Sequence, residues 1–394
     1  MKILNITKYF YPNVGGIESR NLEISRHLTG KYHKVYTLTS NHTGNLKNFE
    51  IYDGIEIIRH KILFTKFNDP FYPGEIFDIL KLNYDLVHVD LPDPINSVFA
   101  FFASVLKSKP LYVTYHADIE KEELEKFPAN LILNAYNLIL KMVLWQARKI
   151  FVTSKEYSKS SKSLKNLKFE DECTHGKLVL SPNFINAQEL RFDVTNKENR
   201  KKIEEIKEKS GLNNKKIILF VGRLVPYKGA KYLIEAFKKV EEEDDDTVLI
   251  IIGSGPLKEE LEDLAKGSKN IKFTWRVEDL KPYYSLCDVF VLPSVSRQEA
   301  FGIALIEAMF FGKPCITTDI DSGMKYVVDY GNAGILVKPK DASGLKNEII
   351  KLIKDDGLRK EIGEKARKRV LEKFASRVVL EKFEKEINKL IPKT

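Results

Sequence analysis

Hydrophobic and polar positions alternate along the chain in two successive series. The first series begins with the apolar run MKILNIT and the amphipathic stretch IESRNLEISRHL, and apolar runs such as YDLVHVD and PLYVTYH follow. The second series begins near residue 216 and includes KIILFVGRL, TVLIIIGSG and VFVLPS, again with amphipathic stretches between several of them. Strand-length apolar runs that alternate with helical patterns are typical of βαβ units. The pattern therefore predicts an α/β protein with two successive parallel-sheet domains.

The two series meet in a polar segment, which places the domain boundary. Residues 196–214 are polar and charged and follow the stretch SPNFIN. A chain of 394 residues is also longer than a single hydrophobic core usually supports. We therefore predict an N-terminal domain over residues 1–182 and a C-terminal domain over 183–375. The pattern of residues 376–394 predicts one more amphipathic helix.

Composition and charge narrow the class of protein. A hydrophobic content of 43% and a charged content of 30% indicate a globular protein with an ample core. The net charge of +9 is spread along the chain, so no nucleic-acid partner is expected, because such proteins concentrate their basic residues. The most apolar run, SVFAFFASVL, is about half as long as a bilayer crossing requires. Cys173, Cys287 and Cys315 show neither metal-ligand nor disulfide spacing, which favours a reducing cytoplasm.

The stretch FVGRLVPYKG (220–229) is the first candidate binding motif. An apolar strand ends at Gly222, Arg223 follows, and Lys228 precedes Gly229 at the start of a helix. Glycine lets a ligand approach the backbone, and the guanidinium and ammonium groups attract phosphates. A basic loop exposed to water is the alternative interpretation of this pattern taken alone.

The stretch EAFGIALIEA (299–308) is the second candidate motif. Glu299 falls in a loop ahead of a predicted helix, and Glu307 falls within that helix. Backbone N–H groups of residues 301–303 are left free by helix geometry and can bind a phosphate or a sugar hydroxyl. Carboxylates suit the vicinal hydroxyls of a sugar, although a helix-capping Glu299 and a solvent-facing Glu307 would fit the pattern equally well.

Five motifs in a fixed order carry a resemblance to a known family. They are GGIE (15–18), TYHAD (114–118), GRLVPYKG, GSGP (253–256) and EAFGIALIEA. Together they resemble the retaining glycosyltransferases of family 4, and the similarity extends over nearly the whole chain. The resemblance implies the GT-B fold, in which two Rossmann-like domains face each other across a cleft. It also implies that the helix at 376–394 returns to the N-terminal domain.

The resemblance implies a role for each matched residue. Arg223 and Lys228 would hold the donor diphosphate, Glu307 the ribose and Glu299 the transferred sugar. The implied donor-binding set is Gly16, Gly222, Arg223, Lys228, Glu299, Phe301, Gly302, Ile303 and Glu307. The implied catalytic set is His116, Arg223, Lys228 and Glu299, and Asp118 lies beside His116.

The implied reaction is retaining hexose transfer from a nucleotide-sugar. TYHADI is most similar to members that use GDP-mannose, so mannose is favoured over UDP-glucose and UDP-N-acetylglucosamine. In the family, the leaving phosphate is thought to deprotonate the acceptor hydroxyl. Because Arg223 and Lys228 would supply the positive charge and no DxD-like motif follows a strand, we expect no metal, and no cofactor beside the nucleotide-sugar co-substrate. The expected acceptor is a glycan or a lipid-linked glycan at the cytoplasmic membrane face.

Departures from the family pattern keep other interpretations open. Trp275 stands in FTWRV where the family usually has glycine, so it could stack on the nucleotide base or pack in the core. GSGPLK places Lys258 where a dinucleotide fingerprint needs a small residue, which argues against a dehydrogenase. A GT-B-fold epimerase that acts on the nucleotide-sugar alone and a non-catalytic binding subunit are the rival functions.

Two apolar segments leave a further pair of alternatives open. Residues 95–109 and 130–149 are rich in apolar side chains and have basic residues towards their ends, including Lys107 and Lys109. They could pack against the sheet of the N-terminal domain or rest on an anionic bilayer surface. We therefore expect a cytoplasmic protein, either free or in peripheral contact with the inner face of the cell membrane.

Overall fold

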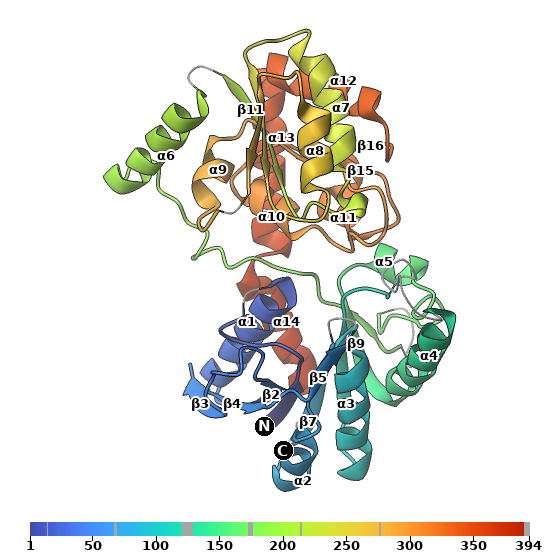
Figure 1. The fold of residues 1–394 in the computed structure, drawn as a ribbon. Helices are drawn as coiled ribbons and strands as arrows, with labels where there is room; N and C mark the ends of the chain where they lie inside the picture. Colours follow the sequence, from blue (N-terminus) through green and yellow to red (C-terminus); the bar gives the residue numbers. More distant parts are fainter. Residues whose placement is uncertain are drawn as a thin grey trace. The chain divides into compact units, whose positions relative to one another are not determined.

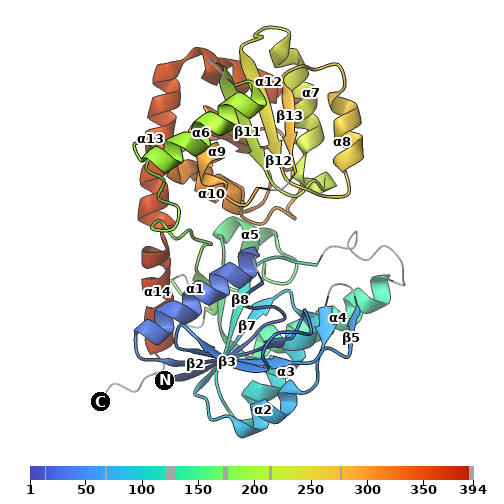
Figure 2. The same cartoon turned by 60° about the vertical axis from the view of Figure 1, so that its left-hand side comes forward.

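The computed structural model describes residues 1–13, 15–66, 69–119, 129–171, 176–212, 215–275 and 277–389. The chain forms two compact units (Figures 1 and 2). The N-terminal unit comprises Met1–Pro182 and Val379–Thr394, and the C-terminal unit comprises Asn183–Val378. Cys173 and Arg276 lie outside the described residues, whereas Cys287 and Cys315 are buried free thiols.

The N-terminal unit is built on an eight-stranded sheet in the order β10-β9-β8-β7-β1-β2-β4-β3. All neighbouring strands are parallel except the antiparallel pair β3 and β4. The strands are β1 (Lys2–Ile6), β2 (Lys34–Ser40), β3 (Phe49–Tyr52), β4 (Ile55–His60), β7 (Leu86–Leu91), β8 (Leu111–Tyr115), β9 (Ala147–Val152) and β10 (Leu178–Leu180). The strand order reverses between β1 and β7, and ligands commonly bind at the carboxyl ends of strands at such a point.

Helices cover this sheet, and a short hairpin lies beside it. The hairpin is formed by β5 (Phe64–Lys66) and β6 (Asp69–Phe71). The helices are α1 (Gly16–Gly30), α2 (Glu75–Lys81), α3 (Pro94–Leu106), α4 (Ala129–Gln146), α5 (Lys155–Ser160) and the C-terminal α14 (Ser376–Asn388).

Helix α14 packs beside α1 in the N-terminal unit (Figures 1 and 2). The ring of Phe383 lies 4.4 Å from that of Phe151 on β9. His27 Nε2 lies 2.8 Å from Glu384 Oε2, which joins α1 to α14. The predicted return of the C-terminal helix to the N-terminal domain is confirmed.

The C-terminal unit contains a six-stranded parallel sheet in the order β13-β12-β11-β14-β15-β16. Its strands are β11 (Lys216–Val221), β12 (Thr247–Ile252), β13 (Ile271–Thr274), β14 (Val289–Leu292), β15 (Cys315–Thr318) and β16 (Ile335–Val337). Its helices are α6 (Lys197–Ser210), α7 (Ala230–Glu241), α8 (Lys258–Ala265), α9 (Lys281–Leu286), α10 (Ile303–Phe310), α11 (Gly323–Val327), α12 (Ala342–Lys354) and α13 (Asp356–Lys373), with 3₁₀ turns at η2 (Pro226–Lys228) and η3 (Asp329–Gly331).

The apolar runs of the sequence form the centre of this sheet. Every residue of β12 and β14 is buried, because helices cover both faces of a parallel sheet. The strand order reverses between β11 and β14, so the loops that follow these two strands diverge from one crevice. The predicted α/β class with two parallel-sheet units is confirmed.

Candidate active site

The loops after β11 and β14 meet in an ion pair between Lys228 and Glu299. Lys228 Nζ contacts Glu299 Oε2, and Ser294 Oγ donates a hydrogen bond to the same carboxylate oxygen at 3.2 Å. The two side chains are only 13% and 9% exposed. A buried carboxylate is stable only with such partners, so the ion pair fixes both functional groups at the carboxyl end of the sheet.

Glycines let three loops approach one another at this edge. A Cβ on Gly229, whose φ is +70°, would lie 2.0 Å from the carbonyl oxygen of Pro293. A Cβ on Gly253, whose φ is +150°, would lie 1.8 Å from that of Gly222. The GRLVPYKG and GSGP motifs are therefore required in part for backbone packing, which places Lys228 against the β14 loop.

Helix α10 begins at Ile303, shortly after Glu299 in the chain. Gly302, with φ of +83°, turns the chain into the helix, and the side chain of Phe301 is buried against Phe374. Within the described part of the chain, the backbone N–H groups of Phe301, Gly302 and Ile303 donate to no protein acceptor. These donors are available for an anionic or hydroxyl-bearing ligand.

Glu307 lies further along α10 and contacts a different partner. Tyr284 Oη on α9 donates a hydrogen bond of 2.7 Å to Glu307 Oε2. Desolvation raises the pKa of Glu307 above its ordinary value, and the hydrogen bond from Tyr284 offsets part of this effect. The structure therefore gives the two glutamates of the motif separate environments.

Arg223 follows β11 and Trp275 follows β13, the two strands that pair with β12. Arg223 is exposed and forms no ion pair with the described residues, so its guanidinium is available to a ligand. Trp275 stacks on Phe273 with ring centres 5.0 Å apart, and Lys258 Nζ lies 4.3 Å from its ring centre. In this structure the indole ring of Trp275 therefore contacts the side chains of Phe273 and Lys258.

In the N-terminal unit, His116 is paired with Asp90, an acid that belongs to none of the five motifs. His116 follows β8, and its Nε2 lies 2.7 Å from Asp90 Oδ1 at the end of β7. Asn21 Nδ2 on α1 also donates to Asp90. Burial opposes ionisation of Asp90, but the His116 hydrogen bond and nearby positive groups outweigh it and lower the pKa of Asp90. Asp90 therefore holds the orientation of His116.

The other residues matched in this unit differ in their surroundings. Gly16 is exposed and is the first residue of α1. Asp118 accepts hydrogen bonds from Tyr115 Oη and from Ser161 Oγ, the latter at 2.7 Å. Those bonds give Asp118 a structural role in holding the loop after β8.

A cluster of acids close to β7 is a second feature without a sequence motif. Asp69, Glu75 and Asp93 are all buried, and neither carboxylate oxygen of Glu75 has a hydrogen-bond partner among the residues that the structure describes. Asp93 caps α3, where it accepts hydrogen bonds from the backbone N–H and side-chain amide of Asn96 at 3.1 and 2.9 Å. Desolvation and the charge of Asp69 raise the pKa of Asp93 to about 8. No group of three His, Cys, Asp or Glu side chains among the described residues is arranged to hold a metal ion.

Sequence signals for the missed partners differ in strength. Asp90 ends the strand-like run YDLVHVD, and adjacent parallel strands bring their carboxyl ends together, so its proximity to His116 could have been inferred. Nothing in the sequence around Tyr284 singles it out. No helix among the described residues is long and apolar enough to cross a membrane.

The fold of the chain is that of the GT-B glycosyltransferases. A structure of HepE from Anabaena in complex with UDP has a TM-score of 0.77 to this chain at 18% identity, and covers 99% of this chain and 100% of HepE. The chain is 27% identical over 386 residues to the O-antigen chain mannosyltransferase C of Escherichia coli, with 95% of each protein covered. It is 28% identical over 305 residues to the D-rhamnosyltransferase WbpZ of Pseudomonas aeruginosa, with 76% of this chain and 72% of WbpZ covered.

Two family models assign the chain more closely. Residues 14–172 match Glycosyltransferase Family 4, and residues 202–369 match Glycosyl transferases group 1. The chain belongs to this glycosyltransferase family and is an enzyme that transfers a sugar from a nucleotide-sugar. The resemblance seen in the five motifs is confirmed.

Proposed function

We propose that this enzyme transfers mannose from GDP-mannose to a glycan or lipid-linked acceptor, with retention of configuration and without a metal ion. The ion pair of Lys228 and Glu299 carries the proposal, because it places a phosphate-binding cation and a hydroxyl-binding carboxylate side by side. The similarity to the O-antigen chain mannosyltransferase supports mannose as the sugar. The UDP bound to HepE supports a UDP-sugar as the second candidate donor.

In this proposal the nucleoside diphosphate is bound by side chains and backbone of the C-terminal unit. The exposed Arg223 and the ammonium of Lys228 stabilise the negative charge that develops on the leaving diphosphate. The free N–H groups at the start of α10 contribute to the same site, and Glu307 accepts hydrogen bonds from the ribose. These groups supply the charge stabilisation that a metal ion provides in other transferases.

Glu299 and His116 are assigned to the transferred sugar. Glu299 can accept hydrogen bonds from sugar hydroxyls through the carboxylate oxygen that does not contact Lys228 and Ser294. Asp90 holds His116 so that one ring nitrogen is engaged and the other can face a substrate. The acceptor hydroxyl passes its proton to the leaving phosphate as the new glycosidic bond forms and the bond to the diphosphate breaks.

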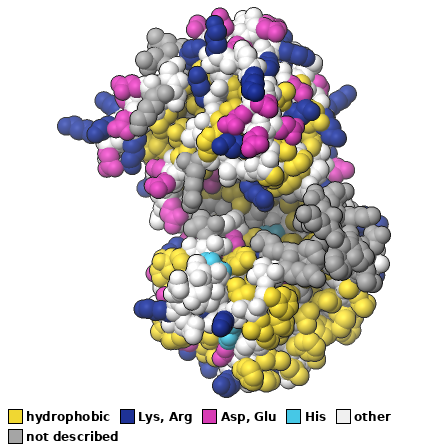
Figure 3. Space-filling view, viewed as in Figure 1, with side chains coloured by type: hydrophobic (Ala, Val, Ile, Leu, Met, Phe, Trp, Pro, Cys, Tyr) yellow, Lys and Arg dark blue, Asp and Glu magenta, His cyan; other side chains and the backbone are white. Residues whose placement is uncertain are grey.

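The acceptor side of the proposal rests on an apolar surface of the N-terminal unit. Helix α3 buries small and polar side chains, including Ala100 and Ser104, and exposes Phe102, Val105 and Leu106. Helices α2 and α4, which pack beside α3, also expose large apolar residues (Figure 3). We call this the three-helix surface, and it consists of Ile76, Phe77, Leu80, Phe102, Val105, Leu106, Leu138, Met142 and Trp145.

Basic residues accompany the three-helix surface. Lys81, Lys141 and Arg148 are exposed on or beside these helices, and Asp78, the partly exposed acid of α2, pairs with His60. An exposed apolar face with basic neighbours suits the surface of an anionic membrane, where a lipid-linked acceptor would be presented. We therefore propose peripheral contact with the inner face of the cell membrane.

The experiment that tests the proposal combines donor choice with product analysis. The protein is screened for thermal stabilisation by GDP-, UDP- and ADP-sugars and is then incubated with GDP-mannose and a membrane lipid extract in the presence of EDTA. We expect stabilisation by GDP-mannose and an α-linked mannosyl product. Epimerised donor without acceptor would instead establish an isomerase, and donor binding without any product would establish a binding subunit.

A further inference from the structure

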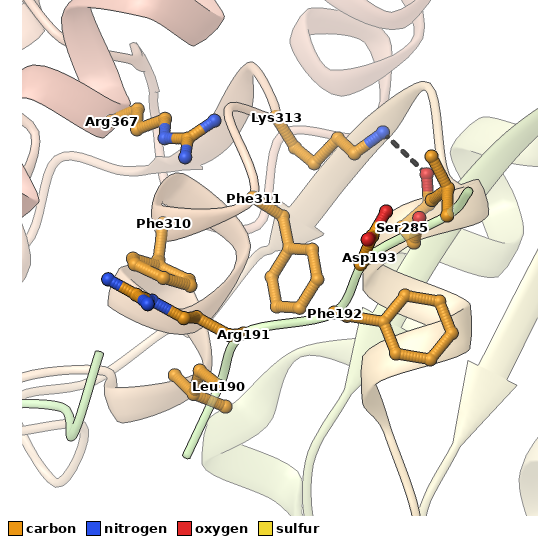
Figure 4. A pocket seen from close by; sticks show the side chains of 10 residues that line it. Leu190, Arg191, Phe192, Asp193, Ser285, Phe310, Phe311, Lys313 and Arg367 are labelled. Atoms are coloured by element: carbon orange, nitrogen blue, oxygen red, sulfur yellow. Dashed lines mark hydrogen bonds between the residues drawn. The ribbon is translucent and has the colours of Figure 1, made fainter. Parts of the chain in front are cut away.

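A pocket of about 550 Å³ lies in the C-terminal unit at the carboxyl end of α10 (Figure 4). Its walls come from the segment 190–194, from the ends of α9 and α10 and from α13. Its volume is within the range of roughly 300–1,000 Å³ that small-molecule sites occupy. None of the residues that line it belongs to the proposed donor site.

The pocket combines aromatic side chains with cations. Phe192, Phe310 and Phe311 supply the rings, and the ring planes of Phe310 and Phe311 are nearly perpendicular, with centres 5.7 Å apart. Arg367 lies above Phe310, with Cζ 5.9 Å from the ring centre, and Arg191 lies on the other side of that ring (Figure 4). An aromatic or apolar group can therefore pack on a floor that has guanidinium groups at its edge.

The charges in the pocket are unbalanced. Arg191, Lys313 and Arg367 form no ion pair within the part of the chain that the structure describes. Lys313 Nζ donates to the carbonyl oxygen of Ser285 at 2.8 Å. The acid of the pocket, Asp193, accepts hydrogen bonds from the backbone N–H and the hydroxyl of Thr195 at 2.8 and 2.7 Å. A negatively charged ligand would therefore find three cations and one carboxylate that is already bonded.

Phe311 and Tyr284 connect the pocket to Glu307. The ring of Phe311, which lines the pocket, stacks on that of Tyr284 with centres 5.7 Å apart. Tyr284 in turn donates its hydroxyl hydrogen bond to Glu307. A ligand that displaces Phe311 would move the hydrogen-bond donor of the glutamate that the proposed function assigns to the ribose.

We propose that this pocket is a second binding site, for an organic phosphate with an aromatic or apolar part, and that its occupancy changes the affinity of the donor site for nucleotide. Guanidinium forks bind phosphate through paired hydrogen bonds, and the phenylalanine rings contact the rest of the ligand. The effect on nucleotide affinity rests on the proposed function, whereas the binding of an organic phosphate in the pocket does not.

Phenyl phosphate is the probe for the site, since it joins one ring to one phosphate. Binding is measured by calorimetry on the full chain and on the double variant Arg191→Ala, Arg367→Ala, whose two side chains are exposed and whose fold should be unaffected. Lys368→Ala is the matched control. Lys368 is an exposed cation on the same turn of α13 as Arg367, but it does not line the pocket. We expect at least tenfold weaker binding in the double variant and unchanged binding in Lys368→Ala and in Arg223→Ala.

Absence of binding to the parent protein, or equal binding to the double variant, would overturn the site. Loss of binding in Arg223→Ala would show that the probe occupies the donor site, which would overturn it as well. For the coupling, the dissociation constant of GDP is measured with and without saturating phenyl phosphate, and a severalfold change is expected. An unchanged constant overturns the coupling. A protein that binds phenyl phosphate but transfers no sugar would contradict the proposed function and leave the second site intact.

Discussion

Lys228 and Glu299, which stand on different loops of the C-terminal unit, form a nearly buried ion pair. Truncation of one partner in such a pair leaves the other charge desolvated and alone, and this costs more than the pair itself contributes. Arg223, which precedes Lys228 in the segment that follows β11, has no such partner among the described residues. The two cations of one motif therefore differ in what their removal should do to the folded state.

Arg223→Ala and Lys228→Ala should each lower turnover by two or more orders of magnitude. Each removes a preorganised charge at the leaving diphosphate, worth about 3–4 kcal/mol at such sites. Only Lys228→Ala should also lower the melting temperature, because it leaves the Glu299 carboxylate without its cation. Steady-state kinetics and thermal unfolding of both variants measure this, and near-normal turnover in both would contradict the diphosphate assignment.

Glu307→Ala should weaken the binding of free GDP, whereas Glu299→Ala should spare GDP and impair the binding of GDP-mannose. The reason is that Glu307 is assigned to the ribose and Glu299 to the sugar. Tyr284→Phe is the matched control, because it keeps the ring stacked on Phe311 and removes only the hydrogen bond to Glu307. It should produce a smaller loss of GDP affinity, of about 1 kcal/mol. Identical profiles for the two glutamate variants in calorimetry would refute the division of roles.

Asp90→Asn should reduce the maximal rate with little change in the KM for donor. The substitution removes the charge that orients His116, and both residues belong to the N-terminal unit, whereas Arg223 and Lys228, which are assigned to the diphosphate, belong to the C-terminal unit. An amide can still accept a hydrogen bond from Asn21, so the fold should persist. Kinetics at saturating donor and calorimetry with GDP separate the effects. Loss of GDP affinity would indicate that Asp90 acts on the donor.

The three-helix surface should bind anionic vesicles at low ionic strength and bind zwitterionic vesicles less. Charge reversal at Lys81 and Lys141, or serine at Phe102 and Trp145, should reduce co-sedimentation. Lys107, which ends the apolar segment of α3, is a poor choice, because its Nζ donates to the carbonyl oxygens of Leu80 and Leu82 at 2.8 and 2.6 Å and secures the end of α2.

The matched controls for the vesicle experiment are exposed residues of the other unit. Charge reversal at Lys231 and Lys360, in the C-terminal unit, should leave sedimentation unchanged. Equal recovery with both vesicle types, or with neither, would favour a soluble glycan acceptor.

Asp93 should make the stability of the N-terminal unit depend on pH. The pKa of Asp93 is raised to about 8 by burial and by the charge of Asp69. From about pH 4 to pH 8 the folded chain holds a proton that the unfolded chain has released, so the free energy of unfolding falls as the pH rises. Asp93→Asn should flatten this slope and make the variant more stable than the parent protein at pH 8.5.

Urea denaturation between pH 5 and pH 8.5 measures the effect of Asp93→Asn. Asp85→Asn, at an exposed position of the same unit, is the matched control. Some slope should remain in Asp93→Asn, because burial also raises the pKa of Asp69 and of Glu75. Parallel curves for Asp93→Asn and the parent protein would contradict the prediction.

The fold was predictable because its determinants are local. Runs such as TVLIII are apolar along their whole length, and such runs separated by helical patterns leave few arrangements other than covered parallel sheets. The donor motifs were predictable for the same reason. Lys228 and Glu299 each stand a few residues beyond a buried strand, and parallel strands bring such loops to one edge.

Contacts between distant segments were not predictable to the same degree. The Tyr284–Glu307 hydrogen bond joins two residues that are 23 positions apart on two short helices, and neither residue carries a signal for the other. In α3, the apolar pattern identifies a helix but does not say that Ala100 and Ala103 face the sheet while Phe102 and Leu106 face outward. Side-chain size decided that orientation, because small residues allow the closest approach of helix and sheet.

The packing of α14 in the N-terminal unit bears on how the protein is synthesised. Because Val379–Thr394 complete that unit, the whole C-terminal unit is inserted within it in the order of the chain. At about 5–20 residues per second, a ribosome needs roughly 10–40 s to produce the inserted unit. During that interval Phe151 and Tyr112 lack the helix that contacts them in the folded protein. The first unit to emerge is therefore the last to be completed, and its contacts with α14 form only after the whole inserted unit has been synthesised.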